Sequence, residues 1–336
     1  MIDIIYHENS ITEHPRTREI MERFPKASRI SCENHKEIFN PSGQNFRLQK
    51  KKPSLILAEK KRNFALPIPP TYGIGGKNNF YFSHMLNCIY DCRYCFLQGM
   101  YPSAHYVLFV NYEDFLDDIK NKTMQEPTEP TWFFSGYDCD SLALENISTF
   151  TDSFLPFFQK NTNARLELRT KSVNITPLLK HTPSENIVTA FSFTPKEISI
   201  QLEHGVPSVS SRIRAMQKLT EKGWQVGLRI DPIIDCQDFE KRYQKLFQDI
   251  FFSVPVDKIH SVSLGAFRMP TNFFKKMEKL HPDEKLFASS LEKRGGSVSY
   301  RLEIEHARKE TCERLLLKHI GKEKIFSCET SPEPSQ

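Results

Sequence analysis

Three closely spaced cysteines are the side chains of this chain best suited to chemistry. Cys88, Cys92 and Cys95 lie between His84 and Phe96, with three and then two residues separating them. A four-iron cluster is normally held by four thiolates, so a group of three with no fourth nearby leaves one iron free for a non-protein ligand. The spacing therefore predicts a 4Fe-4S cluster with these three cysteines as its metal ligands.

The same cysteines have two other interpretations, a structural zinc site and buried free thiols. Zinc sites use four ligands in a tetrahedral arrangement, and the triplet supplies three. His84 could be a fourth ligand, but the sequence places it on the strand before the cysteine loop. The spacing favours the cluster over zinc.

The segment around the cysteines resembles the radical S-adenosylmethionine superfamily. It follows an apolar run, and Tyr94 and Phe96 flank the third cysteine. In that superfamily the open iron binds the amino and carboxylate groups of S-adenosyl-L-methionine, and an electron from the cluster splits the sulfonium to give a 5'-deoxyadenosyl radical. The resemblance implies that cofactors perform the hard step. It also implies an external one-electron donor of the flavodoxin or ferredoxin type.

Within that superfamily the chain resembles spore photoproduct lyase and its relatives, the radical DNA-repair lyases that revert a methylene-bridged thymine dimer. The resemblance runs from about Phe80 to Leu280. Four stretches carry it, at residues 92–98, 106–111, 140–145 and 170–174, and the first reads Cys-Arg-Tyr-Cys-Phe-Leu-Gln. The implied activity is that of a lyase that repairs or modifies a base in DNA or another nucleic acid.

The resemblance assigns cofactor-binding roles by position. Tyr94 would flank the cluster. Lys171 and Ser192, at the ends of two successive barrel strands, would contact the methionine carboxylate and the ribose of the cofactor. Asp140 ends a neighbouring segment and is expected beside them as a third cofactor-binding residue. A lysine suits a carboxylate as a point charge, although Lys171 could also be a solvated surface lysine.

Two positions depart from the family pattern. Tyr137 stands where the lyase has a cysteine that returns a hydrogen atom, and Phe96 stands where it has a relaying tyrosine. Because residues two apart in an extended segment point to the same side, Cys139 could face the substrate and act as donor. It could equally be a buried small hydrophobe. The catalytic candidates are therefore Cys139, Tyr137 and Tyr94.

The changed positions leave a second function open. The chain could keep the cluster as a structural or electron-carrying element, or retain a binding role with no photoproduct lyase turnover. Formation of 5'-deoxyadenosine separates an enzyme from such a protein.

Charged residues at other strand ends are further candidates. Asp138, Arg229 and Asp231 interrupt apolar runs, where an unpaired buried charge would be costly. An ion pair of Arg229 with Asp231 or Asp140 that closes the barrel is as plausible as a substrate role. Arg268 could meet a phosphate, as could any surface arginine.

The elements that must position these residues alternate between strands and helices, which predicts a parallel sheet with crossover helices. The expected strands are 80–86, 106–110, 131–134, 164–170, 187–193, 226–230 and 261–266, and the expected helices are 115–119, 142–158, 210–221 and 239–251. The family resemblance favours a partial (β/α)6 TIM-type barrel of the radical SAM type over a doubly wound sheet. In such barrels function collects at the C-terminal ends of the strands.

Three regions are expected. Residues 1–77 form a small N-terminal α/β segment that ends in a linker at 63–77, where proline and glycine break regular structure. Residues 78–288 form the barrel. Residues 289–336 form a C-terminal extension with a strand at 298–302, a helix at 307–317 and a disordered tail over the last ten residues.

Composition agrees with a cytoplasmic enzyme. Eight cysteines in 336 residues, three of them bunched and the rest scattered, form no disulfide framework, which indicates a reducing compartment. No run approaches the roughly 20 apolar residues of a membrane span. A net charge of +5 permits nucleic-acid binding without requiring it. The basic stretch 47–62 fits a phosphate-tracking surface, although lysines on a solvated face are the usual explanation.

Overall fold

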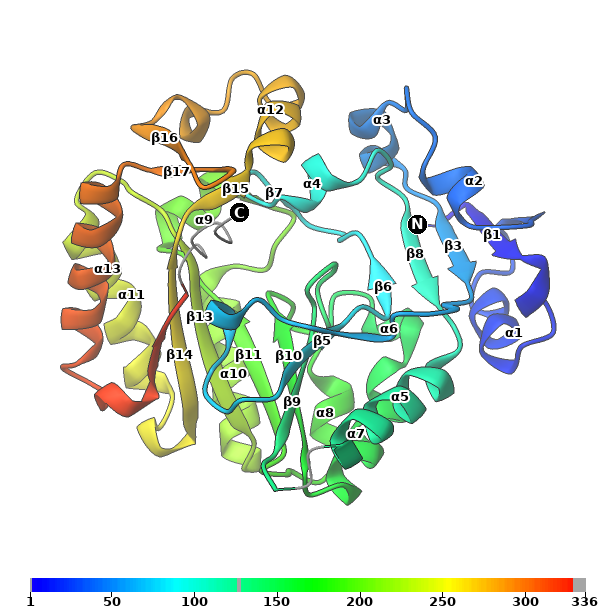
Figure 1. The fold of residues 1–336 in the computed structure, drawn as a ribbon, viewed down its shortest axis with the longest axis horizontal. Helices are drawn as coiled ribbons and strands as arrows, with labels where there is room; N and C mark the ends of the chain where they lie inside the picture. Colours follow the sequence, from blue (N-terminus) through cyan, green and yellow to red (C-terminus); the bar gives the residue numbers. More distant parts are fainter. Residues whose placement is uncertain (1, 126–127, 329–336) are drawn as a thin grey trace.

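Two sheets organise the molecule, which is a computed structural model that describes residues 2–125 and 128–328. An eight-stranded sheet, here called the barrel sheet, curls around its inner face, and a five-stranded sheet, the N-terminal sheet, lies beside it (Figure 1). The tail expected to be disordered lies outside the described residues from position 329 onward. Residues 325–327, by contrast, form a strand.

The barrel sheet has the order β18-β14-β13-β11-β10-β9-β5-β4. Its strands are β4 (Ala65–Pro67), β5 (Asn79–Phe82), β9 (Thr131–Ser135), β10 (Ala164–Thr170), β11 (Ile187–Ser192), β13 (Gln225–Ile233), β14 (Ile259–Ala266) and β18 (Ile325–Ser327). All neighbours pair in parallel except β4 and β5. The six strands from β5 to β14 confirm the partial (β/α)6 barrel, and β4 and β18 extend it at either edge.

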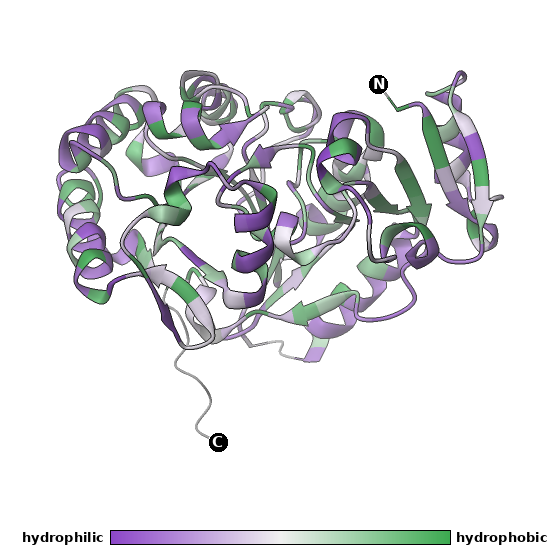
Figure 2. Cartoon of the chain, turned by 90° about the horizontal axis from the view of Figure 1, so that it is seen from above, coloured by the Kyte–Doolittle hydropathy of each residue, from purple (hydrophilic) through white to green (hydrophobic). Residues whose placement is uncertain are grey.

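Burial on both faces explains why these strands are nearly continuous apolar runs. All five residues of β9 and all six of β11 are buried, as expected for parallel strands covered on both sides. Helices pack on the outer face in one hydrophobic core. They are α5 (Tyr112–Gln125), α7 (Phe150–Lys160), α8 (Thr176–Lys180), α10 (Val209–Lys222), α11 (Phe239–Ser253) and α13 (Leu302–Leu316). Helices at the periphery alternate between hydrophilic and hydrophobic residues (Figure 2).

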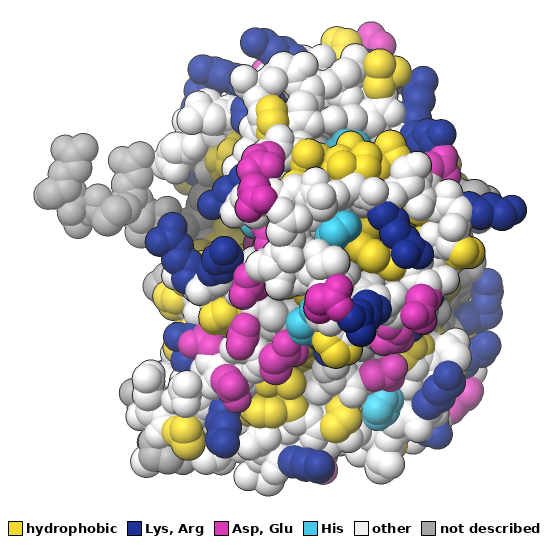
Figure 3. Space-filling view, turned by 90° about the vertical axis from the view of Figure 1, so that its right-hand side faces the viewer, with side chains coloured by type: hydrophobic (Ala, Val, Ile, Leu, Met, Phe, Trp, Pro, Cys, Tyr) yellow, Lys and Arg dark blue, Asp and Glu magenta, His cyan; other side chains and the backbone are white. Residues whose placement is uncertain are grey.

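The N-terminal sheet has the order β2-β1-β3-β8-β6 and takes strands from both sides of residue 77. Its strands are β1 (Ile4–Glu8), β2 (Ser28–Cys32), β3 (Leu55–Ala58), β6 (Met85–Leu86) and β8 (Tyr106–Phe109), and its helices are α1 (Pro15–Glu22), α2 (Lys36–Phe39) and α3 (Phe46–Lys51). Lys, Arg, Asp and Glu side chains are interspersed on the face that these elements present (Figure 3). That face carries no large surface of one charge sign.

Three sequence expectations about this region are wrong. The strand expected at 106–110 forms, but as β8 it pairs with β3 and lies outside the barrel. The strand expected at 80–86 is split between β5 in the barrel sheet and β6 in the N-terminal sheet. The expected linker contributes β4 to the barrel sheet, and Pro67 is accommodated because β4 is an edge strand. Residue 77 therefore does not separate two sheets.

Short elements complete the described chain. They are β7 (Asp91–Cys92), β12 (Glu203–His204), β15 (Arg268–Pro270), β16 (Leu291–Arg294), β17 (Ser297–Tyr300), α4 (Leu97–Met100), α6 (Glu145–Ser148), α9 (Lys196–Leu202) and α12 (Thr271–Leu280). The expected C-terminal strand is β17, which pairs with β15 across the expected boundary at 288. The expected helix at 307–317 is α13, which begins earlier. Among the described residues, no helix is long and apolar enough to cross a membrane.

Candidate functional site

The cysteine loop is fastened to the chain that follows strand β11. Within the loop, β7 pairs antiparallel with β12, so that Cys92 lies opposite Glu203. The Arg93 amide also donates to the Leu202 carbonyl at 2.8 Å. Because β12 follows the C-terminal end of β11, this pairing holds the cysteines at the edge of the barrel where function was expected.

The chain after the third cysteine is held equally closely. The side-chain amide of Gln98 donates to the Cys92 carbonyl at 2.9 Å. At Gly99 a Cβ would lie 2.6 Å from the Phe273 carbonyl oxygen, so α4 approaches α12 more closely than any other residue type would allow. Phe96, which replaces the expected relaying tyrosine, stacks on Phe273 with ring centroids 6.4 Å apart.

The three thiols suit an iron–sulfur cluster. None is in a disulfide. Burial raises the pKa of each, most strongly that of Cys92, but Lys171 lowers the pKa of Cys92 and Cys95, and Lys50 lowers that of Cys88 and Cys95. In the part of the chain that is described, no three His, Cys, Asp or Glu side chains converge on a single metal ion. A cluster differs because its thiolates bind different irons, and this donor set fits one.

His84, the alternative fourth zinc ligand, lies elsewhere. Its ring stacks on Phe150 with centroids 4.1 Å apart, and burial lowers its pKa to about 3. It belongs to the packed interior beside the barrel helices and is not part of the cysteine loop.

Lys171 is half-buried against the cysteine loop. Its Nζ lies 5.5 Å from the centre of the Tyr94 ring. Burial alone would lower the pKa of Lys171, but Cys92 and Glu203 raise it above its ordinary value. The side chain is therefore a cation beside the cysteines.

The Tyr94 hydroxyl contacts a buried ion pair. The Tyr94 hydroxyl donates to Glu203, whose carboxylate lies 2.6 Å from the Arg212 guanidinium, and both charged side chains are 0% exposed. Arg212 also donates to the Ser192 carbonyl at 2.7 Å. One pair thus links the cysteine loop to the end of β11, where Ser192 is buried.

Asp140 is bonded within the protein. Its two carboxylate oxygens accept hydrogen bonds from the Thr170 hydroxyl, the Lys171 amide and the Leu142 amide, at 2.6, 2.6 and 3.0 Å. These contacts tie the segment after β9 to the end of β10. Asp140 therefore holds the Lys171 backbone in place.

The ion pairs on the inner face of the barrel sheet are not those expected. Glu167 pairs with Arg169 at 3.1 Å on its own strand. Arg229 pairs with Glu167 at 2.5 Å, across β11, because Gly227 and Ala190 are small enough to leave the guanidinium room. Asp231 pairs with Arg268 at 3.0 Å, and Arg268 also donates to the Tyr72 hydroxyl at 2.7 Å. Neither an Arg229–Asp231 pair nor an Arg229–Asp140 pair forms. Arg268, the candidate for binding a phosphate, pairs with the Asp231 carboxylate.

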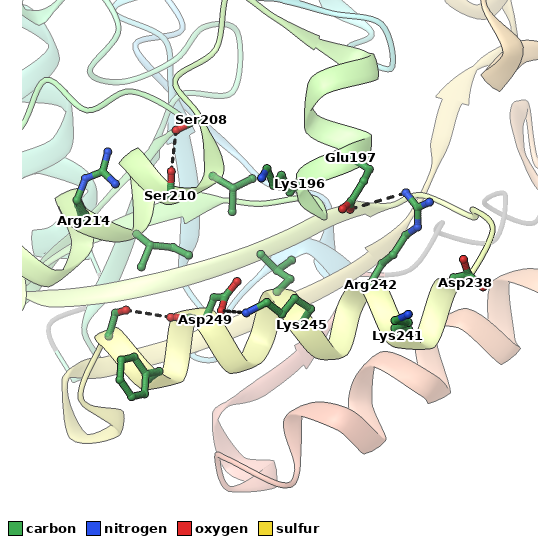
Figure 4. Close-up of a pocket in the computed structure, with 15 residues that line it drawn as sticks. Lys196, Glu197, Ser208, Ser210, Arg214, Asp238, Lys241, Arg242, Lys245 and Asp249 are labelled. Atoms are coloured by element: carbon green, nitrogen blue, oxygen red, sulfur yellow. Dashed lines mark hydrogen bonds and ion pairs between the residues drawn. The ribbon is translucent and has the colours of Figure 1, made fainter.

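A groove of about 710 Å³ lies away from this edge, on the outer face between α9, α10 and α11 (Figure 4). Four of its charged side chains form ion pairs, Arg242 with Glu197 at 3.7 Å and Lys245 with Asp249 at 2.6 Å. It shares no residue with the cysteine loop.

Comparisons with known proteins agree with this geometry. The family model described as "Spore photoproduct lyase" matches residues 1–295. The chain belongs to the spore photoproduct lyase family. It is 23% identical to a spore photoproduct lyase of Bacillus subtilis over 325 residues, which are 92% of this chain and 93% of that protein. A match to the enzyme of Clostridium acetobutylicum, also 23% identical, covers 62% of each chain.

Solved structures of spore photoproduct lyase share the fold. A mutant with bound AdoMet and dinucleoside spore photoproduct superposes with a TM-score of 0.84 and 17% identity, over 98% of this chain and 99% of that chain. As a member of the family, the chain is a radical S-adenosylmethionine enzyme of the lyase type.

The two residues expected to replace the family's donor cysteine lie in different environments. Tyr137 packs with the aromatic cluster on the inner face of the barrel sheet and stacks on Tyr81, with centroids 4.6 Å apart. Cys139 packs with Met85 and other residues of the N-terminal sheet. The premise of an extended segment is wrong, because the chain bends at 137–139 after Gly136, whose φ is +90°. Tyr137 and Cys139 therefore do not face one side.

Asp138, between them, belongs to a third group. Its carboxylate accepts a hydrogen bond from the Ser83 hydroxyl and another from Tyr101, and Lys60 lies nearby. Burial raises its pKa, while Ser83, Lys60 and Tyr101 oppose the rise. Asp138 is bonded within the protein between the two sheets.

Sequence reasoning in this lyase-family chain missed Glu167, Glu203 and Arg212. The sequence could have identified Glu167, because a carboxylate between Leu166 and Leu168 in a buried strand requires a cationic partner. Glu203 and Arg212 had none, since the first follows a short amphipathic helix and the second lies within a longer one. Their pairing exists only in the folded chain.

Proposed function

We propose that this enzyme acts on a pyrimidine lesion in DNA, with the 4Fe-4S cluster on Cys88, Cys92 and Cys95 and with S-adenosylmethionine beside it. The observation that carries the proposal is the placement of three free cysteines on one loop against Lys171, a half-buried cation that follows β10. When bound, the cluster and the cofactor supply the 5'-deoxyadenosyl radical that removes a hydrogen atom from the substrate.

Lys171 and Ser192 are proposed to bind the cofactor. A fixed ammonium group attracts the methionine carboxylate, and the Tyr94 ring shields it from water on one side. Ser192 lies at the end of the adjacent strand, β11, where Arg212 fixes its carbonyl. Asp140 is proposed to act through Lys171 as a positioning residue, since its carboxylate bonds the Lys171 amide.

Tyr137 is proposed to contact the substrate. Its hydroxyl is buried and has no hydrogen-bond partner among the described residues. A buried hydroxyl without a partner is destabilising, so it is a feature that a ligand would satisfy. Burial also raises its pKa above the ordinary value, so the phenol keeps its proton at neutral pH.

Cys139 remains the proposed hydrogen-atom donor, but not because it faces the same side as Tyr137. Burial raises the pKa of its thiol, and the nearby Cys88 raises it further. It is thus a protonated thiol close to a cluster ligand, packed on the opposite side of the 137–139 bend from Tyr137.

The test uses anaerobically reconstituted protein that is reduced with dithionite and supplied with S-adenosylmethionine. We expect 5'-deoxyadenosine, read by chromatography, and we expect none from the Cys92→Ala variant. Addition of dinucleoside spore photoproduct is expected to give thymidine products, whereas undamaged dithymidine gives none.

The opposite result is equally clear. Protein with an intact cluster that makes no 5'-deoxyadenosine, with or without the photoproduct, contradicts the proposal and favours a cluster kept for binding. Cofactor cleavage without lesion repair would retain the radical chemistry and exclude this substrate.

A further inference from the structure

A pocket of about 350 Å³ opens on the outer side of the cysteine loop, between helix α3 of the N-terminal region and the chain after α12. It is lined by Phe46, Arg47, Lys50, Lys51, Ile89, Asp91, Arg93, Gln98, His204, Gly205 and His281. The mechanism above uses none of these side chains.

The pocket and the cofactor side use different residues of the cysteine loop. Cys92 and Tyr94 are buried, and Tyr94 contacts Lys171 and Glu203. Asp91 and Arg93 line the pocket instead, and Arg93 donates to His281. Among the described residues, none of those that line the pocket forms a hydrogen bond or an ion pair with Lys171.

A continuous hydrogen-bonded path joins the pocket to a cluster ligand. His281 donates from Nε2 to the Gln98 side-chain oxygen at 2.9 Å, and the Gln98 amide donates to the Cys92 carbonyl at 2.9 Å. Arg93 donates to His281 Nδ1 at 3.1 Å. The rate of electron transfer falls steeply where its route crosses empty space. Here two hydrogen bonds connect His281 to the backbone of Cys92.

The pocket carries more positive than negative charge. Asp91 is its single carboxylate, and Arg93 already pairs with it at 2.9 Å. Arg47 and Lys51 are exposed at the rim, and Lys50 donates to the Cys88 carbonyl. The remaining lysines and arginine of the pocket therefore present an uncompensated positive field to solvent.

We propose that this pocket is the docking site for an acidic one-electron carrier protein that reduces the cluster. The inference rests on the proposed function, because only a redox-active cluster needs such a partner. Complementary charge raises the rate of encounter more than the affinity, and electron-transfer interfaces are small and transient. DNA is the less favoured occupant, because the lesion must reach Tyr137, which packs on the inner face of the barrel sheet and does not line this pocket.

The test reverses charge at the rim in the double variant Arg47→Glu/Lys51→Glu. Both residues are exposed on α3, so the fold is expected to survive. Reduction of the reconstituted cluster is followed by stopped-flow absorbance with flavodoxin hydroquinone, an acidic donor, and separately with reduced methyl viologen, a small cation. The double variant Arg214→Glu/Lys241→Glu, at two exposed positions in the groove on the outer face, reverses the same number of charges and is the matched control.

We expect the flavodoxin rate to fall roughly 10- to 100-fold at low ionic strength and to lose most of its salt dependence. The methyl viologen rate and the 5'-deoxyadenosine yield with that reductant should not fall. An unchanged flavodoxin rate overturns the docking site, as does a variant that loses oligonucleotide binding while the flavodoxin rate is kept. Loss of 5'-deoxyadenosine with methyl viologen in the wild type would instead contradict the proposed function.

Discussion

The buried pair Glu203–Arg212 gives the sharpest stability prediction. Two unit charges 2.6 Å apart attract each other by about 6 kcal/mol at an effective dielectric constant of about 20. Each ion, however, has lost several kcal/mol of hydration, because both side chains are fully buried. The net contribution of the intact pair is therefore small, whereas loss of one partner is costly.

Glu203→Gln removes the charge and replaces one of the two carboxylate oxygens, which accept from Tyr94 and from Ser199 respectively, by an amide nitrogen. Burial alone would raise the pKa of Glu203, yet Arg212 and Lys171 hold it below its ordinary value, so the carboxylate balances two cations. We expect the free energy of unfolding to fall by about 3 kcal/mol. With a denaturant slope of about 3 kcal/mol per molar for a chain of this size, the urea midpoint should fall by roughly 1 M.

The assay is urea unfolding of the reduced apoprotein, followed by far-ultraviolet circular dichroism. The double variant Glu203→Gln/Arg212→Met removes both charges, and we expect it to be more stable than Glu203→Gln alone. Glu278→Gln, at an exposed position on α12, should change the free energy of unfolding by less than about 0.5 kcal/mol. A single variant within 1 kcal/mol of the wild type, or a double variant less stable than the single, would refute the reasoning.

Four further predictions concern single residues. Burial would raise the pKa of Glu167, but Arg229 and its neighbours lower it from 4.5 to about 2. The stabilising contribution of the carboxylate, about 3 kcal/mol, is therefore complete above pH 4.5 and lost as the pH falls toward 2. The stability difference between wild type and Glu167→Gln, measured by urea unfolding, should shrink over that pH range. Lys171→Met should raise the dissociation constant of S-adenosylmethionine about tenfold or more, measured by equilibrium dialysis, because a charged hydrogen bond contributes about 1.5–3 kcal/mol. Gly99→Ala should lower the free energy of unfolding by about 1–3 kcal/mol and reduce the iron bound per chain, because the new Cβ meets the Phe273 backbone. Tyr137→Phe should leave the urea midpoint unchanged or higher, since it removes an unpartnered hydroxyl, and should slow lesion turnover about tenfold if one neutral hydrogen bond to the substrate is lost.

Each of these four has a contradicting result. A pH-independent difference for Glu167→Gln would mean that the carboxylate is not held ionised in the folded state. Unchanged cofactor binding by Lys171→Met would remove Lys171 from the cofactor site. Full iron loading of Gly99→Ala would show that α4 tolerates displacement. Unchanged turnover by Tyr137→Phe would exclude contact between its hydroxyl and the substrate.

Local spacing explains which predictions could be made about the cysteine loop. The positions of Cys88, Cys92 and Cys95 are fixed within one short loop, so their relation needs no knowledge of distant residues. The strands at 164–170 and 187–193 were readable for a similar reason, because strands buried on both faces are continuous apolar runs. Lys171 and Ser192 lie at the ends of these adjacent strands, so the sequence predicted that they are neighbours.

The wrong strand assignments concern segments that could pair in either of the two sheets. Residues 106–109 form an apolar strand that would suit either sheet, and pairing with β3 decides the matter. The 137–139 segment misled for a related reason, since alternation holds only in an extended chain and the bend after Gly136 cancels it.

Three features could be read from the sequence: three cysteines at cluster spacing, a lysine at a strand end, and the alternation of strands and helices that builds a half-barrel. The partners of the buried charges became known only from the folded chain, namely Glu203 with Arg212, Glu167 with Arg229, and Asp231 with Arg268. The physical reason is that metal-ligand spacing and strand periodicity are short-range properties of the chain. The partner of a buried charge is chosen by which side chains the packed strands leave within reach.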